Sequence, residues 1–337
     1  MPGRRRPWFR PGNPGVATTG FYLHPAAPLH DTGWGHPEHQ GRLRALASSV
    51  GRDLIALHGK VEQVDPGPAG EDDLLRVHSR AHLETVRAGV ENARASNTVV
   101  AIEADTRVSA ASSEAALGTA GAGIEAVRDV AGGRFANAFV AARPPGHHAT
   151  PDRPMGFCLF NNVAIAARRL QDEGLAERIL IVDWDVHHGN GTQDVFYEDP
   201  QVFFLSLHQY PHYPGTGGAD ETGTGAGEGY TLNVPLAAAT RRDHYRGIFI
   251  EALREAESRL EPDFVLVSSG FDVLAGDPLG GQLLEPDDLH AMTREVMALA
   301  DRRCGGRLVV FLEGGYDPAR TGQGTVAVIR ALAGVGE

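Results

Sequence analysis

The stretch DWDVHHGNGTQ, residues 183–193, places two carboxylates and two imidazoles within six consecutive residues. Asp185 and His187 stand two residues apart, so on an extended segment their side chains point the same way. A carboxylate oxygen and an imidazole nitrogen are both suitable ligands for Zn²⁺ or another divalent ion. The stretch fits a metal site, an acid/base relay or a polar loop after a strand. For Asp185 and His187 alone we favour the polar loop.

A third metal ligand has to come from elsewhere in the chain, and Asp272 is the natural candidate. It follows the apolar run DFVLVSSG, residues 263–270, whose last residue, Gly270, we expect to let the backbone turn sharply. A set of two aspartates and one histidine leaves coordination positions open for water and substrate, as a catalytic site requires.

The tandem histidines in RPPGHH, residues 143–148, favour a proton relay beside a metal. His147 and His148 follow Pro-Pro-Gly, which constrains the loop, and histidine is the side chain best suited to exchange protons near neutral pH. Each imidazole needs a partner that orients its other ring nitrogen, and Asp183 and Asn190 are available for this. Tyr316 follows two glycines, and its hydroxyl can donate a hydrogen bond to negative charge that develops on a polarised carbonyl.

Five apolar runs supply the strands that must position these residues. They are FANAFVAA (135–142), RILIVDWD (178–185), QVFFLSLH (201–208), DFVLVSSG (263–270) and RLVVFLEGG (307–315). Continuous apolar runs of this length indicate strands buried on both faces. Segments of helical period lie between them, at 161–174, 245–260 and 286–303. The alternation predicts an α/β fold, with a parallel sheet covered by helices on both sides.

The polar clusters follow the ends of these runs, where open α/β sheets bind their ligands. Five strand ends carry one each: RPPGHH, DWDVHHGN, HQYPHYPGTG, GFDVLAGDP and EGGY. The glycine-rich patch at 216–229 is predicted to be a long surface loop, not a domain boundary. We therefore expect one catalytic domain over residues 19–337.

Composition limits the function further. The 337 residues carry a formal charge of -12, which makes nucleic-acid binding an unlikely main activity, and no apolar run is long enough to cross a membrane. The two cysteines, Cys158 and Cys304, offer no disulfide framework, which suits a reducing cytoplasm. The basic start MPGRRRPWFRPGNPG is followed by no apolar region of an export signal, so we expect a flexible basic tail over residues 1–18.

These motifs together resemble the zinc-dependent histone deacetylase family. The resemblance runs from HPE at residues 36–38 to the end of the chain, through PPGHHA, GFC, FNN, DWDVHHGNGTQ, YPGTG, SSGFD, GDPLG and EGGY in order. Asn190, where class I members carry aspartate, makes the chain similar to class II members and bacterial deacetylase-like amidohydrolases. The resemblance implies the three-layer α/β/α arginase-deacetylase fold with a mostly parallel, eight-stranded sheet.

The resemblance also implies a role for each polar residue. Asp185, His187 and Asp272 would bind one catalytic Zn²⁺, with Fe²⁺ as an alternative ion. Asp183 would orient His147, and His148, near Asn190, would act as general base and then acid. Tyr316 would polarise the acetyl carbonyl, and zinc-bound water would attack it to give acetate and a free amine.

Further residues match the family's substrate tunnel and ion sites. The tunnel would be formed by Gly156, Phe157, Tyr213 and Leu279, with Tyr213 where phenylalanine is common. Arg42 matches an arginine near an internal channel linked to acetate release. Structural K⁺ would be bound by Asp183, Asp185, His187, Ser206 and Leu207. A second monovalent site would lie near Phe196, Asp199, Val202 and Tyr230.

The expected substrates are acetylated lysine in a peptide or protein, or an acetylated polyamine or other small acyl amine. One alternative is a dimanganese ureohydrolase of the arginase type, but Gly189 stands where a second bridged metal would favour another aspartate. Another alternative is a non-catalytic acyl-lysine binder, which would not need the full set of hydrolytic residues.

Overall fold

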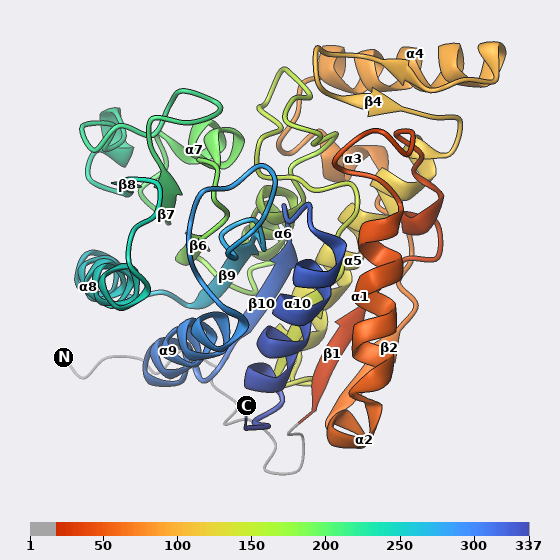
Figure 1. Cartoon of the computed structure of the whole chain (residues 1–337). Helices are drawn as coiled ribbons and strands as arrows, with labels where there is room; N and C mark the ends of the chain where they lie inside the picture. The colour runs from red at the N-terminus through yellow and green to blue at the C-terminus, as the bar shows by residue number, and fades with distance from the viewer. Residues whose placement is uncertain (1–17, 337) are drawn as a thin grey trace.

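The computed structural model of the chain describes residues 18–336, and eight of its strands form one sheet. These strands are β1 (Thr19–Tyr22), β2 (Val61–Val64), β5 (Asn137–Val140), β6 (Ile179–Asp183), β7 (Val202–Gln209), β8 (Thr231–Leu236), β9 (Phe264–Ser269) and β10 (Leu308–Leu312). They lie in the order β2-β1-β5-β10-β9-β6-β7-β8, and every neighbouring pair is parallel (Figure 1). The expected mostly parallel sheet is thus parallel throughout.

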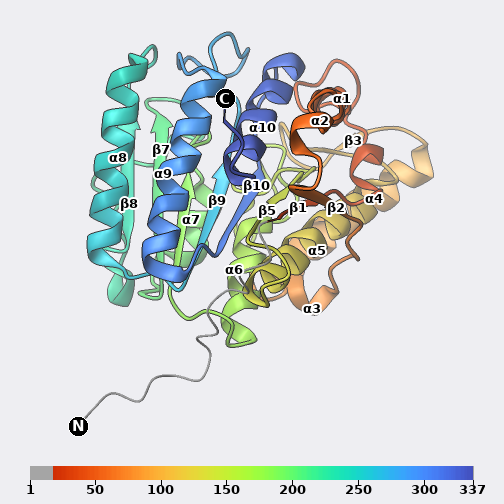
Figure 2. The same ribbon diagram turned by 90° about the horizontal axis from the view of Figure 1, so that it is seen from below.

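Helices cover both faces of the sheet, which confirms the predicted three-layer α/β/α fold. The helices are α1 (Gly41–Arg52), α2 (Leu54–Leu57), α3 (Glu71–Leu74), α4 (Arg80–Ser96), α5 (Ser112–Ala131), α6 (Asn162–Asp172), α7 (Asn190–Phe196), α8 (Arg242–Arg259), α9 (Pro286–Cys304) and α10 (Pro318–Leu332). Figure 2 shows α8, α9, α10 and α1 side by side on one face and α5 and α6 on the other. A short hairpin of β3 (Val100–Ala101) and β4 (Arg107–Val108) lies apart from the main sheet.

The five predicted apolar runs form β5, β6, β7, β9 and β10, which occupy the middle of the sheet and the β7 side. Every residue of β5, β6, β9 and β10 is buried, because helices pack on both faces of these strands. The three predicted helices are α6, α8 and α9. The predicted stop of the last one is also observed, since Gly305 caps α9 with a φ of 65°.

Several helices begin directly after a loop of the carboxyl edge, and their caps fix that loop. The Asn161 side chain accepts a hydrogen bond from the Ala164 amide at the start of α6. The Asp317 carboxylate accepts from the Ala319 and Arg320 amides at the start of α10. Both caps therefore anchor a segment of the FNN and EGGY motifs to a rigid element.

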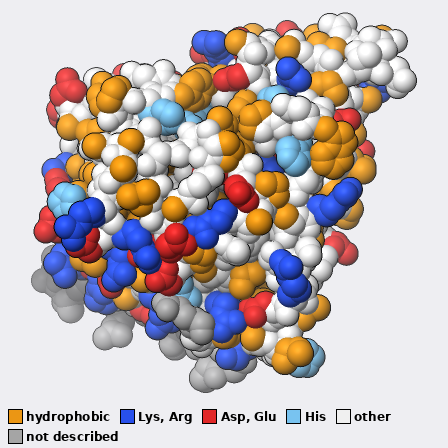
Figure 3. All heavy atoms as spheres, viewed as in Figure 1, with side chains coloured by type: hydrophobic (Ala, Val, Ile, Leu, Met, Phe, Trp, Pro, Cys, Tyr) orange, Lys and Arg blue, Asp and Glu red, His pale blue; other side chains and the backbone are white. Residues whose placement is uncertain are grey.

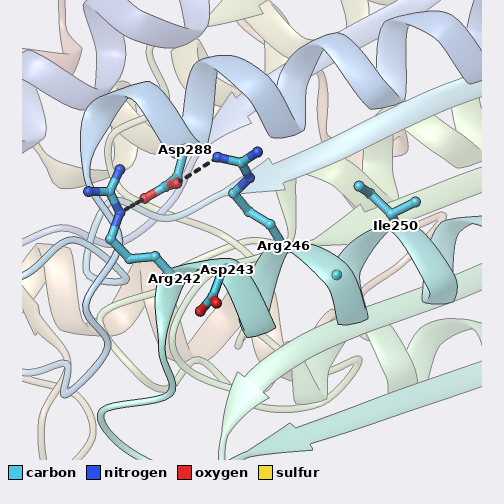
Figure 4. Close-up of a pocket in the computed structure, with 6 residues that line it drawn as sticks. Arg242, Asp243, Arg246, Ile250 and Asp288 are labelled. Carbon is cyan, nitrogen blue, oxygen red and sulfur yellow. Dashed lines mark hydrogen bonds and ion pairs between the residues drawn. The ribbon is translucent and has the colours of Figure 1, made fainter.

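On the outer helix layer, α8 and α9 are joined by an ion-pair cluster (Figure 4). Arg242 and Arg246 of α8 both reach the buried carboxylate of Asp288 on α9, and Arg242 also pairs with Asp287. Because both arginines are paired with carboxylates of α9, this ion-pair cluster holds the two helices together. Basic and acidic side chains are likewise interspersed over this face of the molecule (Figure 3).

Two further expectations concern the basic N-terminal tail and the absence of a membrane-spanning segment. The predicted tail over residues 1–18 lies outside the described residues except for Thr18. Within residues 18–336 no helix combines the length and the apolar character needed to cross a membrane.

Candidate metal centre and active site

Three side chains that the sequence singled out as metal ligands meet at the carboxyl edge of the sheet. Asp185 and His187 lie on the loop after β6, and Asp272 lies on the loop after the neighbouring strand β9. One ligand atom of each lies within 4.8 Å of the others, and all three residues are buried. His187 Nδ1 is 3.0 Å from Asp185 Oδ1 and 3.3 Å from Asp272 Oδ2. The cluster has the donor types and the size for one divalent ion.

The backbone around this cluster leaves room only for glycine. A Cβ on Gly314 would lie 2.0 Å from Asp272 Oδ2, and a Cβ on Gly270 would lie 2.2 Å from Asp185 Oδ2. Gly270 does not adopt a positive φ, so the sharp turn expected of it is not its contribution. It is needed because the strand end passes directly against a carboxylate.

Hydrogen bonds orient the two carboxylates and leave one oxygen unused. The amides of His187 and Gly314 donate to Oδ1 and Oδ2 of Asp185, and the amide of Val186 donates to Oδ1 of Asp272. Asp272 Oδ2 is buried and accepts no well-formed hydrogen bond from any residue in the described range. A buried carboxylate oxygen without a donor is costly, and a cation would satisfy it.

The pKa shifts of the cluster residues also indicate that the cluster favours a bound cation or proton. Burial, together with the neighbouring Asp185 charge, raises the pKa of Asp272 from 3.8 to about 7. Against its own burial, the close carboxylates of Asp185 and Asp272 raise the pKa of the His187 imidazole from 6.5 to about 10. Protons therefore occupy the cluster when no ion does, and the residues fit a divalent metal well.

The tandem histidines lie beside the cluster with the partners that were expected. His147 Nδ1 is 2.9 Å from Asp183 Oδ2, and His148 Nδ1 is 2.8 Å from Asn190 Oδ1. Asn190 Nδ2 also donates to the His148 carbonyl, at 3.4 Å, which sets the amide so that its oxygen faces the ring. His148 therefore carries its proton on Nδ1, and its Nε2 is left as an acceptor.

The two imidazoles have opposite pKa shifts. Although burial favours the neutral form, the charges of Asp183 and Asp185 raise the pKa of His147 to about 10. Burial and the neighbouring His147 and His187 lower the pKa of His148 well below 6.5. At neutral pH, His147 is thus cationic and paired with Asp183, and His148 is neutral.

Tyr316 lies beside the same cluster, on the loop after β10. Its ring centroid lies 6.5 Å from that of His187 and 5.6 Å from that of Phe157. Burial and the charge of Asp272 raise the pKa of its phenol well above 10, so the hydroxyl remains a donor. Arg42 is fully buried behind it, with its guanidinium carbon 5.1 Å from the Tyr316 ring centroid.

Arg42, which is predicted to lie near an internal channel, makes hydrogen bonds to the backbone of the EGGY loop. Its Nε donates to the Gly315 carbonyl and its Nη2 to the Glu313 carbonyl, both at 2.5 Å. Its Nη1 pairs with the buried carboxylate of Glu38 at 3.0 Å. A solvated helix-start arginine would make none of these contacts.

Two further carboxylates position the site, and sequence reasoning assigned no role to either. Asp277 accepts hydrogen bonds from the Leu279 amide through Oδ1 and from the Tyr316 and Asp317 amides through Oδ2. Glu313 accepts through Oε2 from the Gly146 and His147 amides. Asp277 lies in the GDPLG motif and Glu313 in the EGGY motif, and membership of these motifs is the sequence feature that could have pointed to them.

Of the predicted tunnel residues, Gly156 and Tyr213 contact His148, Phe157 packs against Tyr316, and Leu279 lies on the loop after β9. The Tyr213 ring is perpendicular to that of His148, with centroids 5.2 Å apart, and is 37% exposed. The Leu279 carbonyl accepts from His212 Nε2, which joins the loops after β7 and β9. Gly156 packs against His148, since a Cβ there would lie 2.3 Å from the imidazole.

The residues of the predicted potassium set lie on β6, on β7 and on the loop after β6. Asp183 and Ser206, from the predicted potassium set, are directly paired in the register of β6 and β7, and Leu207 follows in β7. His188, the second imidazole of the DWDVHHGNGTQ stretch, bonds to Thr216 through Nδ1 and to Gln193 through Nε2, so it holds neighbouring loop residues together.

A parallel α/β sheet with a buried Asp₂His cluster and paired imidazoles at its strand ends has the features expected of a metal-dependent hydrolase. The family profile described as "Histone deacetylase domain" matches residues 36–332, and the chain belongs to this family. It is therefore a hydrolytic enzyme that acts on amide bonds.

Known relatives agree with this assignment. The chain is 40% identical to "Histone deacetylase 10, chloroplastic" of Oryza sativa subsp. japonica, over 89% of this chain and 70% of the relative. It is 38% identical to "Histone deacetylase-like amidohydrolase" of Pseudomonas aeruginosa, over 94% and 80%. The crystal structure of the HDA15 HD domain superposes with a TM-score of 0.87 and 36% identity, covering 95% of this chain and 89% of that one.

Proposed function

We propose that the protein is a metal-dependent deacetylase that removes acetyl or related acyl groups from a primary amine such as that of lysine. The observation that carries the proposal is the position of His148, whose Nδ1 bonds to Asn190 Oδ1, which leaves Nε2 to accept a proton beside the Asp185, His187 and Asp272 cluster. A hydrolase needs such an acceptor next to the ion that binds its nucleophilic water.

Asp185, His187 and Asp272 would hold the ion, and Zn²⁺ suits their nitrogen and oxygen donors, with Fe²⁺ as the alternative. When bound, the ion lowers the pKa of a water molecule and polarises the acyl carbonyl. Asp183 and the neighbouring strand β7, with Ser206 and Leu207, would form the predicted K⁺ site.

His148 would take the proton from the attacking water through Nε2, because His147 already holds a proton shared with Asp183. His148 would then return that proton to the leaving amine nitrogen. The neutral amide of Asn190 keeps the proton of Nδ1 in place without adding negative charge, so His148 stays neutral before each turnover.

Tyr316 would donate its hydroxyl hydrogen to the carbonyl oxygen as negative charge develops there. Its phenol is held in the protonated form by burial, and its amide is fixed by Asp277. A preorganised donor of this kind stabilises the transition state more than the ground state. Arg42, packed behind the ring, would line the exit for the small carboxylate product.

The substrate's alkyl chain would pass between Phe157, Tyr213 and Leu279. Their rings and side chain favour an apolar, unbranched chain, as in acyl-lysine, over a charged one along its whole length. The same passage also suits an acylated polyamine, in which an unbranched methylene chain likewise follows the acyl nitrogen.

A substrate panel tests this proposal. Purified protein would be assayed with acetyl-lysine peptides, acetylated polyamines and longer acyl-lysines, with His148→Ala as the control for the chemical step. We expect hydrolysis of acetyl-lysine that falls about 10²-fold or more in His148→Ala. Equal hydrolysis by both proteins, or none by the metal-loaded protein on any acyl amine, would refute it.

A further inference from the structure

The loop at residues 150–161 carries a strained aromatic residue at its tip. Met155 and Cys158 face each other in a short antiparallel bridge, and the two residues between them, Gly156 and Phe157, have φ angles of 56° and 67°. A two-residue turn with both φ angles positive suits a hairpin, but phenylalanine is unfavourable in this conformation. Such a conformation persists only where the surroundings determine it.

At its tip the loop is held by two hydrogen bonds from its own backbone. The Gly156 amide donates to Asp105 Oδ1 at 3.2 Å, and the Phe157 amide donates to Thr106 Oγ1 at 3.1 Å. Both partners belong to the segment between β3 and β4, which lies outside the main sheet. A second anchor to the body of the protein is therefore needed.

That anchor is His78, whose single imidazole joins both ends of the loop. Its Nδ1–H donates to the Thr150 carbonyl at 2.9 Å, and its Nε2 accepts from the Asn161 amide at 2.8 Å. The residue is buried, and burial lowers its pKa to about 3, which keeps Nε2 free to accept. One neutral ring thus closes the base of the loop.

The start of α4 reinforces this closure with two more hydrogen bonds. The Ser79 amide donates to the Pro151 carbonyl at 2.8 Å, and His82 Nε2–H donates to the Leu159 carbonyl at 2.7 Å. The rings of His78 and His82 lie 4.2 Å apart. Four hydrogen bonds therefore join a five-residue segment, 78–82, to both sides of the loop.

We propose that His78, supported by His82, is a positioning residue that clamps the base of loop 150–161 and so fixes Phe157 and Gly156 beside the reacting groups. Phe157 forms the tunnel wall against Tyr316, and Gly156 packs on His148. The inference deepens the proposed deacetylase function and rests on it for its kinetic consequence. The expected change in hydrogen exchange of residues 150–161 does not depend on that function.

The test compares His78→Phe, which keeps a ring but removes both hydrogen bonds, with His78→Gln, whose amide supplies one donor and one acceptor. Val90→Ala is the control, because Val90 is buried in α4 away from these four hydrogen bonds. Hydrogen exchange of amides in residues 150–161 is measured in each protein, together with kcat and KM for an acetyl-lysine peptide and the metal content.

We expect exchange in the loop to be at least about tenfold faster in His78→Phe than in Val90→Ala. KM should rise about tenfold while kcat falls less than about threefold, since the metal cluster and the imidazoles are held by other segments. His78→Gln should recover part of both effects, and metal content should not change.

Loop exchange and KM in His78→Phe equal to those in Val90→Ala would overturn the clamp, and so would a His78→Gln protein no better than His78→Phe. If His78→Phe does not fold, His82→Phe removes one of the four bonds, and unchanged loop exchange there would also overturn it. A metal-loaded wild-type protein that hydrolyses no acyl amine would refute the deacetylase function, while the exchange comparison would still decide the clamp.

Discussion

His147 and His148 are adjacent and chemically identical, yet their surroundings give them opposite protonation states. A carboxylate, Asp183, faces the first, and a neutral amide, Asn190, faces the second. Negative charge near an imidazole stabilises its protonated form, whereas the oxygen of a neutral amide fixes the tautomer without that effect. Burial and the neighbouring imidazoles favour the neutral form of His148, and the amide at position 190 preserves that form because it adds no negative charge.

Replacing Asn190 with aspartate tests this dependence. The new carboxylate should raise the pKa of His148, so the neutral base would exist only at higher pH. We expect the acidic limb of the kcat/KM profile to move to higher pH by about 1 pH unit. An acidic limb that stays in place or moves to lower pH would contradict the assignment of His148 as the base.

Tyr316 is predicted to contribute through its hydroxyl alone. Tyr316→Phe keeps the ring packed against Phe157 and Arg42, so folding and metal content should match those of the wild type. Loss of the donor should lower kcat by about 10²- to 10³-fold, as for other preorganised donors to an oxyanion. A kcat within a few-fold of the wild type would show that another group polarises the carbonyl.

At the scale of elements, the sequence predicted the strands in the middle of the sheet and missed those nearer its edges. β9 and β10 are buried on both faces and read as continuous apolar runs. β2 (VEQV) and β8 (TLNVPL) are the edge strands, with polar residues and with Pro235 in β8. An edge strand has one side without a neighbour, so its composition gives a weaker signal.

The candidate site was predictable to the extent that its residues follow strands. Parallel strands end at one edge, so the polar clusters after β6 and β9 had to come together there. Asp277 and Glu313 were missed because their partners are backbone amides of distant segments. Residue type does not reveal such contacts, and neither does spacing.

The strand ends impose a steric requirement that one substitution can test. Gly314→Ala places a methyl group where Asp272 Oδ2 lies, 2.0 Å from the new Cβ. We expect metal affinity to fall about tenfold or more, measured by competition with a chelating dye, because both carboxylates must shift. Gly51→Ala is the matched control, since its Cβ would meet nothing within 4 Å. Equal affinities in the two variants would contradict the proposed geometry.

For the whole molecule, the metal-free cluster makes stability depend on pH. The folded pKa of Asp272 is about 7, above its ordinary 3.8, so stability from the protonated form is lost as pH rises towards 7. His187, with a folded pKa of about 10 against 6.5, contributes stability that is complete below 6.5 and is lost as pH rises through 10. Both groups act in the same direction.

A bound ion replaces these protons, so its stabilising effect should grow with pH. We expect the increase in Tm on adding Zn²⁺ to chelator-treated protein to be larger at pH 8 than at pH 6, measured by scanning fluorimetry. Asp272→Asn should abolish most of the increase at both values. An increase that is equal at the two pH values, or larger at pH 6, would count against a metal site built on these carboxylates.

The central claim is that one divalent ion, held by Asp185, His187 and Asp272, supports amide hydrolysis. Its most direct test is to titrate chelator-treated protein with Zn²⁺ while acetyl-lysine hydrolysis is followed. Activity should return in proportion to the added ion and reach its maximum at about one equivalent per chain. Activity that needs two equivalents, or that does not depend on added metal, would contradict it.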